Sequence, residues 1–390
     1  MAGGTVEVRV SLWRSRGMQA LIGVTVLGFA SYCLTLASLP AYAVAGGAGE
    51  STAGVVTAVF LVVTIAVQAT VPALTARFGL GPVLAGGLVA MGAPSPFYVL
   101  DDGVGWIAAL SAVRGAGFAV LTVLGAMLAA QVAPPGRRGE SIGLYGLAIA
   151  VPNLIAVPAG VALVLDGHVG WLAWLSASPL LGLLLVPMLV RSLGPQEPAG
   201  PAGTGRAAAR AAVVPSLVLF VVTMAGGGVV TFLPIERPDG ALATTALLLF
   251  GITGAVTRWR SGLMADRLGG SRVLLPLALG VSAVGLVVTA LGLVAGSAWI
   301  LAGAAVFGAG FGAAQNLTLL AAFARAGAGG TTAASAMWNA SFDAGTATGA
   351  LGLGLAAAGI GLPWTYVLVA AVLVASVPLA SAAARSAVHS

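Results

Sequence analysis

The sequence predicts an all-α integral membrane protein with twelve transmembrane helices in two pseudo-symmetric six-helix halves. Its composition, the spacing of its apolar runs and an internal repeat support this fold class. Of the 390 residues, 59% are hydrophobic and 7% are charged, whereas soluble domains carry about 25% charged residues. Helices are the expected elements, because about 20 apolar residues in a helix cross a bilayer and satisfy their own backbone hydrogen bonds there.

Charged, proline-rich and glycine-rich breaks divide the apolar runs into two sets of six predicted spans. The spans of the first half cover residues 18–44, 53–73, 81–99, 104–131, 142–164 and 169–190. The spans of the second half cover residues 212–234, 241–262, 273–294, 297–324, 332–359 and 363–384. The first run is too long for the core of a signal peptide, so we interpret it as a retained helix.

The longest polar stretch, RSLGPQEPAGPAGTGRAAAR from Arg191 to Arg210, separates the two sets of spans. Its proline and glycine content and its flanking arginines are typical of a linker. We therefore predict an N-terminal half at residues 1–190, a cytoplasmic linker at 191–211 and a C-terminal half at 212–390.

The basic residues, all of them arginines, predict the orientation of the chain. They are scattered between apolar runs and form no basic face for nucleic acid. With the N-terminus inside, nearly all loop arginines fall on one side and only Arg237 falls on the other. Since arginines in short loops accumulate in the cytoplasm, we expect a multi-pass protein of the cytoplasmic (inner) membrane with both termini cytoplasmic.

Short sequence matches recur at a common spacing between the two halves. SLPAY and FLPIE end the first and seventh spans and place Pro40 and Pro234 194 residues apart. SIGLYG and SAMWNA open the fifth and eleventh spans and place Ser141 and Ser335 194 residues apart. The common spacing predicts two parallel repeats of six helices.

A longer pair of matches lies after the second and eighth spans, as PALTARFGLGPVL from Pro72 and GLMADRLGGSRVL from Gly262. The second copy resembles the cytoplasmic signature of the major facilitator superfamily of secondary transporters. The matching residues are Gly262, Asp266, Arg267, Gly269 and Arg272. In the first copy Arg77 and Gly79 survive, and Ala76 stands at the position of Asp266.

The resemblance covers essentially the whole chain, because the spans, the linker and the repeat accompany the signature. The segment RGAGF, which begins at Arg114, resembles a motif of the branch that exports drugs and sugars by proton antiport. The family implies alternating access, in which the halves rock about a central cavity and the signature forms a cytoplasmic gate. The carboxylate of Asp266 is expected to pair with Arg267 or a neighbouring basic residue, and to face the positive N-terminus of a nearby helix. The alternative is a polar turn that caps two helices.

Ionisable groups inside a span cost about 2.5 to 3.5 kcal/mol on insertion scales, so each is a functional candidate. Asp343 lies about halfway along the eleventh span and shares one helical face with Ser335, Asn339 and Thr346. Without a partner, burial would favour its protonated form and make it a proton carrier, whereas a nearby arginine would keep it charged. The alternatives are a structural ion pair or a hydrogen bond to the amides of the tenth span.

Three further charges lie in or beside predicted spans. Arg114 is deep in the fourth span and cannot release a proton. It is therefore expected to hold a carboxylate, to shift the pKa of a carboxylate or to contact the substrate. A pair with Asp343 is one option. Arg258 is near the cytoplasmic end of the eighth span, where we interpret it as a structural charge that reaches the interface. Glu236, at the outer end of the seventh span, is interpreted as a solvated loop charge, with an outer-gate or proton-entry role as the alternative.

Polar and aromatic residues of the central spans are candidates for the wall of a cavity. They are Tyr32, Thr35, Thr223, Met224, Gln315, Asn316, Trp338 and Asn339. Together they describe a mostly apolar cavity with few charges, which suits an amphipathic or lipophilic solute better than a sugar phosphate.

No phosphate-binding loop, metal-ligand spacing or catalytic constellation is present in the sequence, so we expect neither an enzyme nor a cofactor or metal. The leading hypothesis is proton-coupled efflux of a small lipophilic or amphipathic compound, such as a drug or secreted metabolite. The alternative is proton-coupled import of a sugar or other small nutrient, and a third class is a non-transporting receptor. The expected partners are the solute, protons and the lipid bilayer, and we expect a monomer.

Overall fold

The computed structural model describes residues 11–193, 204–236, 240–268 and 270–385, and it contains helices and no strand within these ranges. The helices of the first half are η1 (Leu12–Arg14), α1 (Arg16–Leu36), α2 (Ser38–Ala45), α3 (Glu50–Gln68), α4 (Val71–Phe78), α5 (Leu80–Gly92), η2 (Ser95–Leu100), α6 (Val104–Gln131), α7 (Arg138–Leu165), α8 (Val169–Leu175), α9 (Pro179–Gly182) and α10 (Val186–Ser192). Those of the second half are α11 (Thr204–Glu236), α12 (Gly240–Leu268), α13 (Leu274–Ala295), α14 (Ser297–Ala326), η3 (Ala328–Gly330), α15 (Thr331–Ile360), α16 (Leu362–Ala375) and α17 (Val377–Arg385). The all-helical fold class is confirmed.

The membrane spans follow the apolar runs of the sequence. In the described ranges, ten helical stretches are long and apolar enough to cross a bilayer, and the bent pair formed by α3 and α4 gives an eleventh. The helix at the place of the remaining predicted span, α15, is 30 residues long. It falls outside this set because polar side chains such as Asn339 and Asp343 lower its hydropathy. The twelve predicted spans are therefore consistent with the structure.

The second predicted span, 53–73, is two helices rather than one. Gly54–Gln68 and Val71–Phe78 meet at an angle of 54°. Pro72 occupies the first turn of α4, where its ring lacks an N–H and would clash with the carbonyl group of Gln68 in a continuous helix. The equivalent helix of the second half, α12, carries Gly262 at that position and continues unbroken for 29 residues. In both halves the equivalent residues, Asp266 with Arg267 and Ala76 with Arg77, lie in the last turn of a helix and not in a loop.

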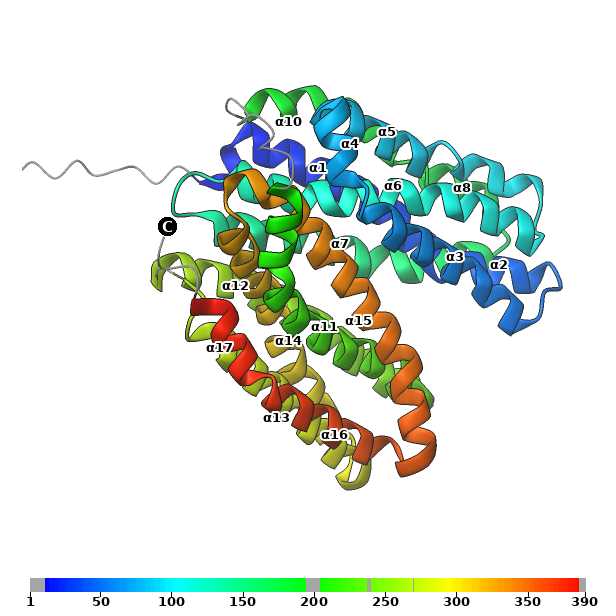
Figure 1. The fold of residues 1–390 in the computed structure, drawn as a ribbon. Coiled ribbons are helices and arrows are strands. Elements are labelled where there is room, and N and C mark those ends of the chain that lie inside the picture. Colours follow the sequence, from blue (N-terminus) through cyan, green and yellow to red (C-terminus); the bar gives the residue numbers. More distant parts are fainter. Residues whose placement is uncertain (1–10, 194–203, 237–239, 269, 386–390) are drawn as a thin grey trace, which may run out of the picture.

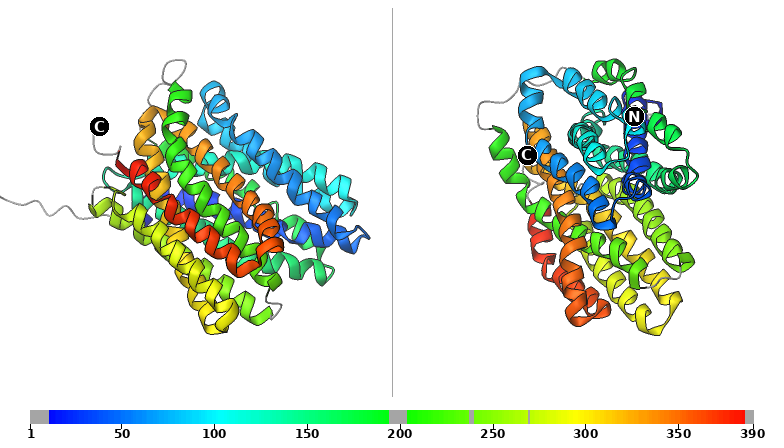
Figure 2. Two further views of the ribbon diagram at one scale, coloured as in Figure 1. Left: turned by 60° about the horizontal axis from the view of Figure 1, so that its bottom comes forward. Right: turned by 90° about the vertical axis from the view of Figure 1, so that its right-hand side faces the viewer.

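The helices form two groups, α1 to α10 and α11 to α17, seen in Figure 1 and from two further directions in Figure 2. The groups approach each other at the end where α10 finishes and α11 begins, which we call the linker end, and they diverge toward the other end. Apolar packing joins them at the linker end, because Leu319, Phe323 and Trp338 belong to the same buried cluster as residues of α1 and α6. A second buried cluster consists only of residues of the second group. The exact boundaries of the two halves stay a prediction, since residues 194–203 lie outside the described part of the chain.

Candidate functional site

The contact surface between the two groups of helices, which we call the seam, contains the ionisable residue of the predicted gate. The carboxylate of Asp266, at the end of α12, accepts hydrogen bonds from the backbone N–H groups of Gly139 and Glu140, both at 2.8 Å. These amides belong to the first turn of α7, where N–H groups have no partner inside the helix. The positive end of the helix dipole also stabilises an anion there. The half-buried carboxylate therefore holds the start of one half's helix against the end of the other half's helix.

Two glycines allow this close approach. A Cβ atom at Gly139 would overlap the carbonyl oxygen of Gly262, and a Cβ atom at Gly262 would overlap the carbonyl oxygen of Gly139. The buried side-chain amide of Asn316, on α14, donates to the Gly139 carbonyl oxygen at 3.2 Å and to the Arg258 carbonyl oxygen at 2.7 Å. At Gly139 and Gly262 the backbones of α7 and α12 are therefore in direct contact, and the side chains of Asp266 and Asn316 bridge the two helices beside this contact.

The other residues of the predicted signature lie outside this contact. Arg267 and Arg272 are exposed, and the expected ion pair of Asp266 with Arg267 is not formed. In the first half, Arg77 is exposed with its guanidinium carbon 5.2 Å from the ring centroid of Phe78, and Gly79 forms the turn between α4 and α5 at a φ of 82°. Gly269 lies outside the described residues.

Arg258 does not extend to the end of its helix as expected. Its side chain is 8% exposed, and Nη1 donates to Oε1 of Gln315 at 2.8 Å. The guanidinium lies against Gly146 of α7, where a Cβ atom would meet Nε at 2.5 Å. The Nε group has no hydrogen-bond partner in the described chain. Arg258 and Gln315 therefore lie in the seam with α7 and do not line an open cavity.

Asp343 lies in another part of the seam, in α15 of the second half, about 18 Å from the start of that helix at 1.5 Å per residue. Its Oδ2 atom accepts a hydrogen bond from Nε2 of Gln68, the last residue of α3, at 2.8 Å. One turn earlier, Nδ2 of Asn339 donates to the carbonyl oxygen of Thr122 at 3.4 Å, and the Ser335 hydroxyl donates to that of Val123 at 2.6 Å. The face predicted for Ser335, Asn339 and Asp343 therefore contacts α3 and α6 of the other half.

Thr346, the fourth member of that face, and the two amides of the tenth span have hydrogen-bond partners other than Asp343. The hydroxyl of Thr346 donates to Phe342 of its own helix at 2.9 Å. Gln315 and Asn316 bind Arg258 and Gly139 and not Asp343. The only side-chain hydrogen-bond partner of Asp343 in the described ranges is the uncharged Gln68. Sequence reasoning missed Gln68 as a site residue. Gln68 occupies the position of the first repeat that is equivalent to Arg258 in the second, and this equivalence could have indicated it.

Arg114 is completely buried inside the first half and does not reach Asp343. Its Nε donates to the Met91 carbonyl oxygen at 3.1 Å, Nη1 to the Tyr98 hydroxyl at 3.2 Å, and Nη2 to the backbone and hydroxyl oxygens of Ser31 at 3.1 and 2.9 Å. These acceptors are uncharged, and no acidic side chain of the described chain pairs with the guanidinium. Arg114 therefore ties α1, α5 and η2 to α6, and the expectation of a carboxylate partner is wrong.

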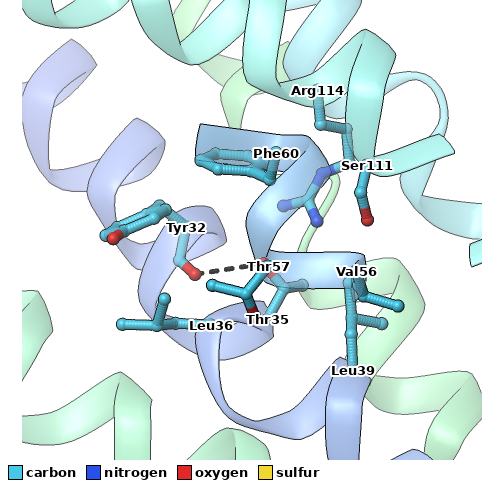
Figure 3. A pocket seen from close by; sticks show the side chains of 9 residues that line it. All are labelled: Tyr32, Thr35, Leu36, Leu39, Val56, Thr57, Phe60, Ser111 and Arg114. Atoms are coloured by element: carbon cyan, nitrogen blue, oxygen red, sulfur yellow. Dashed lines mark hydrogen bonds between the residues drawn. The ribbon is translucent and has the colours of Figure 1, made fainter. Parts of the chain in front are cut away.

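A small pocket adjoins Arg114 between α1, α2, α3 and α6, and Figure 3 shows the side chains around it. The lining residues are Tyr32, Thr35, Leu36, Leu39, Val56, Thr57, Phe60, Ser111 and Arg114. The ring of Tyr32 stacks on Phe118 with centroids 4.3 Å apart and on Phe60 at 5.5 Å. Aromatic rings and three hydroxyl groups thus surround one space, and of the predicted cavity residues Tyr32 and Thr35 are in its wall.

Of the remaining cavity candidates, Thr223 and Met224 pack inside the second half, whereas Trp338 lies in the buried cluster that joins the two halves. The Thr223 hydroxyl donates to Leu219 of its own helix at 3.0 Å, and Gly345 and Gly349 of α15 contact Thr223 and Met224. The indole N–H of Trp338 donates to the Thr318 hydroxyl at 3.1 Å in the buried core. The side chain of Glu236, at the end of α11, lies outside the described part of the chain.

Two groups of membrane helices, joined at one end by polar contacts and with charged side chains buried in the seam, are typical of secondary transporters. The comparisons with known proteins support this class. The model of the family Major Facilitator Superfamily matches residues 20–350. The chain therefore belongs to the major facilitator superfamily, whose members are transporters rather than enzymes. A comparison with the curated proteins gives no match.

Solved structures show the same fold. The E. coli fucose:proton symporter FucP is 13% identical, with a TM-score of 0.73 over 95% of this chain and 99% of that one. The human organic anion transporter MFSD10 (TETRAN) is 16% identical, with a TM-score of 0.73 over 94% and 99%. The proton:xylose symporter XylE is 16% identical, with a TM-score of 0.71 over 93% and 94%. At these identities the similarity establishes the fold.

Proposed function

We propose that the protein is a proton-coupled transporter of a small organic solute that works by alternating access, with Asp343 as the proton carrier. The observation that carries this proposal is the contact of the Asp343 carboxylate with the uncharged Gln68 across the seam at 2.8 Å. A charged carboxylate held at mid-membrane by one neutral amide is costly, and protonation removes the charge. Arg114 and Arg258 cannot serve this purpose, because a guanidinium keeps its proton in a protein.

The coupling follows from where the charge lies. When the seam is closed at the linker end, Asp343 is half-buried and the protonated form is tolerated better than the carboxylate. When the halves separate at that end, water reaches the group and the carboxylate is solvated. Proton binding therefore favours closure of the linker end, and proton release favours its opening. This is the differential interaction with two states that any coupled conformational change requires.

The arrangement of arginines supports an orientation with the linker end in the cytoplasm. In that orientation the structure is closed toward the cytoplasm by Asp266, Gly139 and Gly262, and the halves diverge toward the outside. We propose the cytoplasmic membrane as the location and the signature around Asp266 as the cytoplasmic gate.

The lining of the pocket beside Tyr32 favours an amphipathic solute, but its volume of about 20 Å³ has room for about one water molecule, so the pocket must widen as the halves move before a solute binds. Its rings and aliphatic side chains favour an apolar surface, and its hydroxyl groups favour a few hydrogen bonds. Export of a lipophilic or amphipathic compound by antiport agrees with the apolar lining. Import of a sugar-like nutrient by symport is the second candidate, because Thr57 offers a hydroxyl group next to the flat ring of Tyr32. The hydroxyl groups of Thr35 and Ser111 also line the pocket and are hydrogen-bonded to the Ser31 carbonyl oxygen and to the Tyr98 hydroxyl.

The test is a screen of small solutes for thermal stabilisation of the purified protein, followed by flux measurements in proteoliposomes under an imposed pH gradient. Symport predicts that the solute accumulates on the side toward which protons flow, and antiport predicts movement against the proton flow. If a solute that stabilises the protein crosses the membrane at the same rate with and without the pH gradient, proton coupling in either direction is contradicted.

A further inference from the structure

An apolar groove with a volume of about 360 Å³ lies on the first half, between the bent pair α3 and α4 on one side and α5 and α6 on the other. It belongs neither to the seam contacts described above nor to the pocket beside Tyr32. The groove is lined only by apolar residues, namely Val67, Leu74, Phe78, Pro82, Val83, Gly86, Gly87, Ala90, Ala116 and Val120. Such a wall offers no hydrogen bond to a polar ligand and suits a hydrocarbon.

The bend at Pro72 explains why the groove exists. Up to Gln68, α3 packs closely along α6, and after the 54° bend α4 runs away from α6. The floor is tight, because a Cβ atom at Gly87 would meet the Val120 side chain at 2.6 Å. Next to it, a Cβ atom at Gly86 would have no neighbour within 4 Å. In the second half, the unbroken α12 packs against α14 along its length.

The depth of the groove matches one leaflet of a bilayer. It begins beside Phe78 and Pro82, at the turn of the linker end, and reaches Ala90 on α5. From Pro82 to Ala90, eight residue steps along the helix rise by about 12 Å at 1.5 Å per residue. Half of the hydrocarbon core of a bilayer is about 15 Å thick. The groove therefore runs from the membrane surface toward the middle of the membrane, where lipid acyl chains are the available apolar partner.

A cation stands at the mouth of the groove. Arg77 is exposed at the end of α4, and its guanidinium carbon lies 5.2 Å from the ring centroid of Phe78, which lines the groove. Neither α4 nor α5 contains an acidic residue. A basic side chain at the membrane surface attracts acidic lipid headgroups. The charge at the mouth and the apolar wall behind it are complementary to the two parts of one phospholipid.

We propose that the groove binds an acidic phospholipid from the leaflet at the linker end, with one acyl chain between α4 and α5 and its headgroup phosphate beside Arg77. The opposite side of α4 contacts α15 of the second half. A bound acyl chain therefore fills the space behind α4 and supports it against α15, so the lipid stabilises the closed linker end. This site is independent of the proposed transport function, and its test needs no solute.

The test uses the full chain, delipidated in a neutral detergent, with phosphatidylglycerol or phosphatidylcholine added back, and counts bound lipids by native mass spectrometry. Wild type is expected to bind one phosphatidylglycerol at least about tenfold more tightly than phosphatidylcholine. Gly86→Leu fills the groove and is expected to lose this binding. Arg77→Gln is expected to bind both lipids equally and weakly. Gly280→Leu on α13, where a Cβ atom also has no neighbour within 4 Å, and Arg385→Gln at the exposed end of α17 are the matched controls and should bind as wild type does.

A second filling variant, Ala90→Leu, keeps the test decisive if Gly86→Leu does not fold, and gel filtration and circular dichroism check the fold of each variant. Unchanged phosphatidylglycerol binding in the folded filling variants would overturn the groove as the site. Equal affinity of wild type for the two lipids would overturn the role of the headgroup and of Arg77.

Discussion

The side-chain amide of Gln68 donates a hydrogen bond of 2.8 Å to the carboxylate of Asp343 and thereby joins α3 to α15 across the seam. Gln68 is fully buried, and its own Oε1 atom has no partner in the described chain. An amide carries both a donor and an acceptor, so Gln68 can donate to the carboxylate and can accept from the protonated acid after the amide turns over. The pair can therefore remain in contact in both protonation states, which agrees with the proposed role of Asp343 as the proton carrier.

Asp343→Asn is expected to abolish acceleration of transport by a pH gradient, because asparagine cannot carry the proton. The variant resembles the protonated acid, so it should fold normally and favour the closed linker end. The measurement is solute flux in proteoliposomes with and without a gradient. A folded variant that keeps a gradient-driven flux would remove Asp343 from the coupling role.

Gln68→Glu is expected to make closure of the linker end depend more strongly on pH than it does in the wild type. Two carboxylates in contact repel when both are ionised, and they share a proton when the pH falls. The linker end should therefore be open at high pH and closed at low pH. Spin labels at Ala73 on α4 and Met264 on α12, both exposed, report the distance between the halves. The labels are introduced after the single buried cysteine, Cys33, is replaced by serine. A distance that does not change with pH in Gln68→Glu would contradict this role of the pair.

Asp266→Asn is expected to weaken closure of the linker end and to impair transport. Asparagine has one acceptor oxygen for the two amides of Gly139 and Glu140, and its NH₂ group cannot accept from the second. Hydrogen bonds to a charged group contribute about 1.5 to 3 kcal/mol each. The same label pair should therefore show a larger open population. Ala76→Asp is the comparison in the first half and should leave transport intact; a loss of transport in Ala76→Asp alone would reverse the proposed asymmetry.

Gly139→Ala is expected to prevent the halves from closing at the linker end, because the added Cβ atom would overlap the backbone of Gly262. Gly262→Ala should have the same effect from the other side of the seam. Gly280→Ala is the control, since its Cβ atom would enter open space. The label distance and the transport rate are the readouts. Closure of Gly139→Ala equal to that of the control would show that the backbone contact is not required.

Arg114→Lys is expected to lower thermal stability while the positive charge is kept. The planar guanidinium reaches acceptors on Met91, Tyr98 and Ser31 in three directions, and a single ammonium group cannot reach all of them. The measurement is the unfolding temperature of the purified protein, with the exposed Arg385→Lys as control. An unchanged unfolding temperature in Arg114→Lys would contradict the structural role of this network.

Several features of the site could be predicted from residue patterns alone. The spacing of Ser335, Asn339 and Asp343 places them on one helical face, and that face lies in the seam. The signature around Asp266 predicted a carboxylate near a helix N-terminus, and the structure has this contact with α7. The interpretation of Arg258 as a structural charge stays a prediction; its side chain does not extend to the helix end, because Gly146 leaves room for the guanidinium inside the seam.

The sequence by itself determined the membrane class, the helical spans, the duplicated organisation and the side chains that are too polar for lipid. These features are local, because each helix satisfies its own backbone and each apolar run is read directly from the chain. Only the tertiary structure decided the partners: Gln68 for Asp343, the first turn of α7 for Asp266, and uncharged oxygens for Arg114. Those contacts join residues that are up to 275 positions apart, and they depend on how two helical halves pack, which no local pattern encodes.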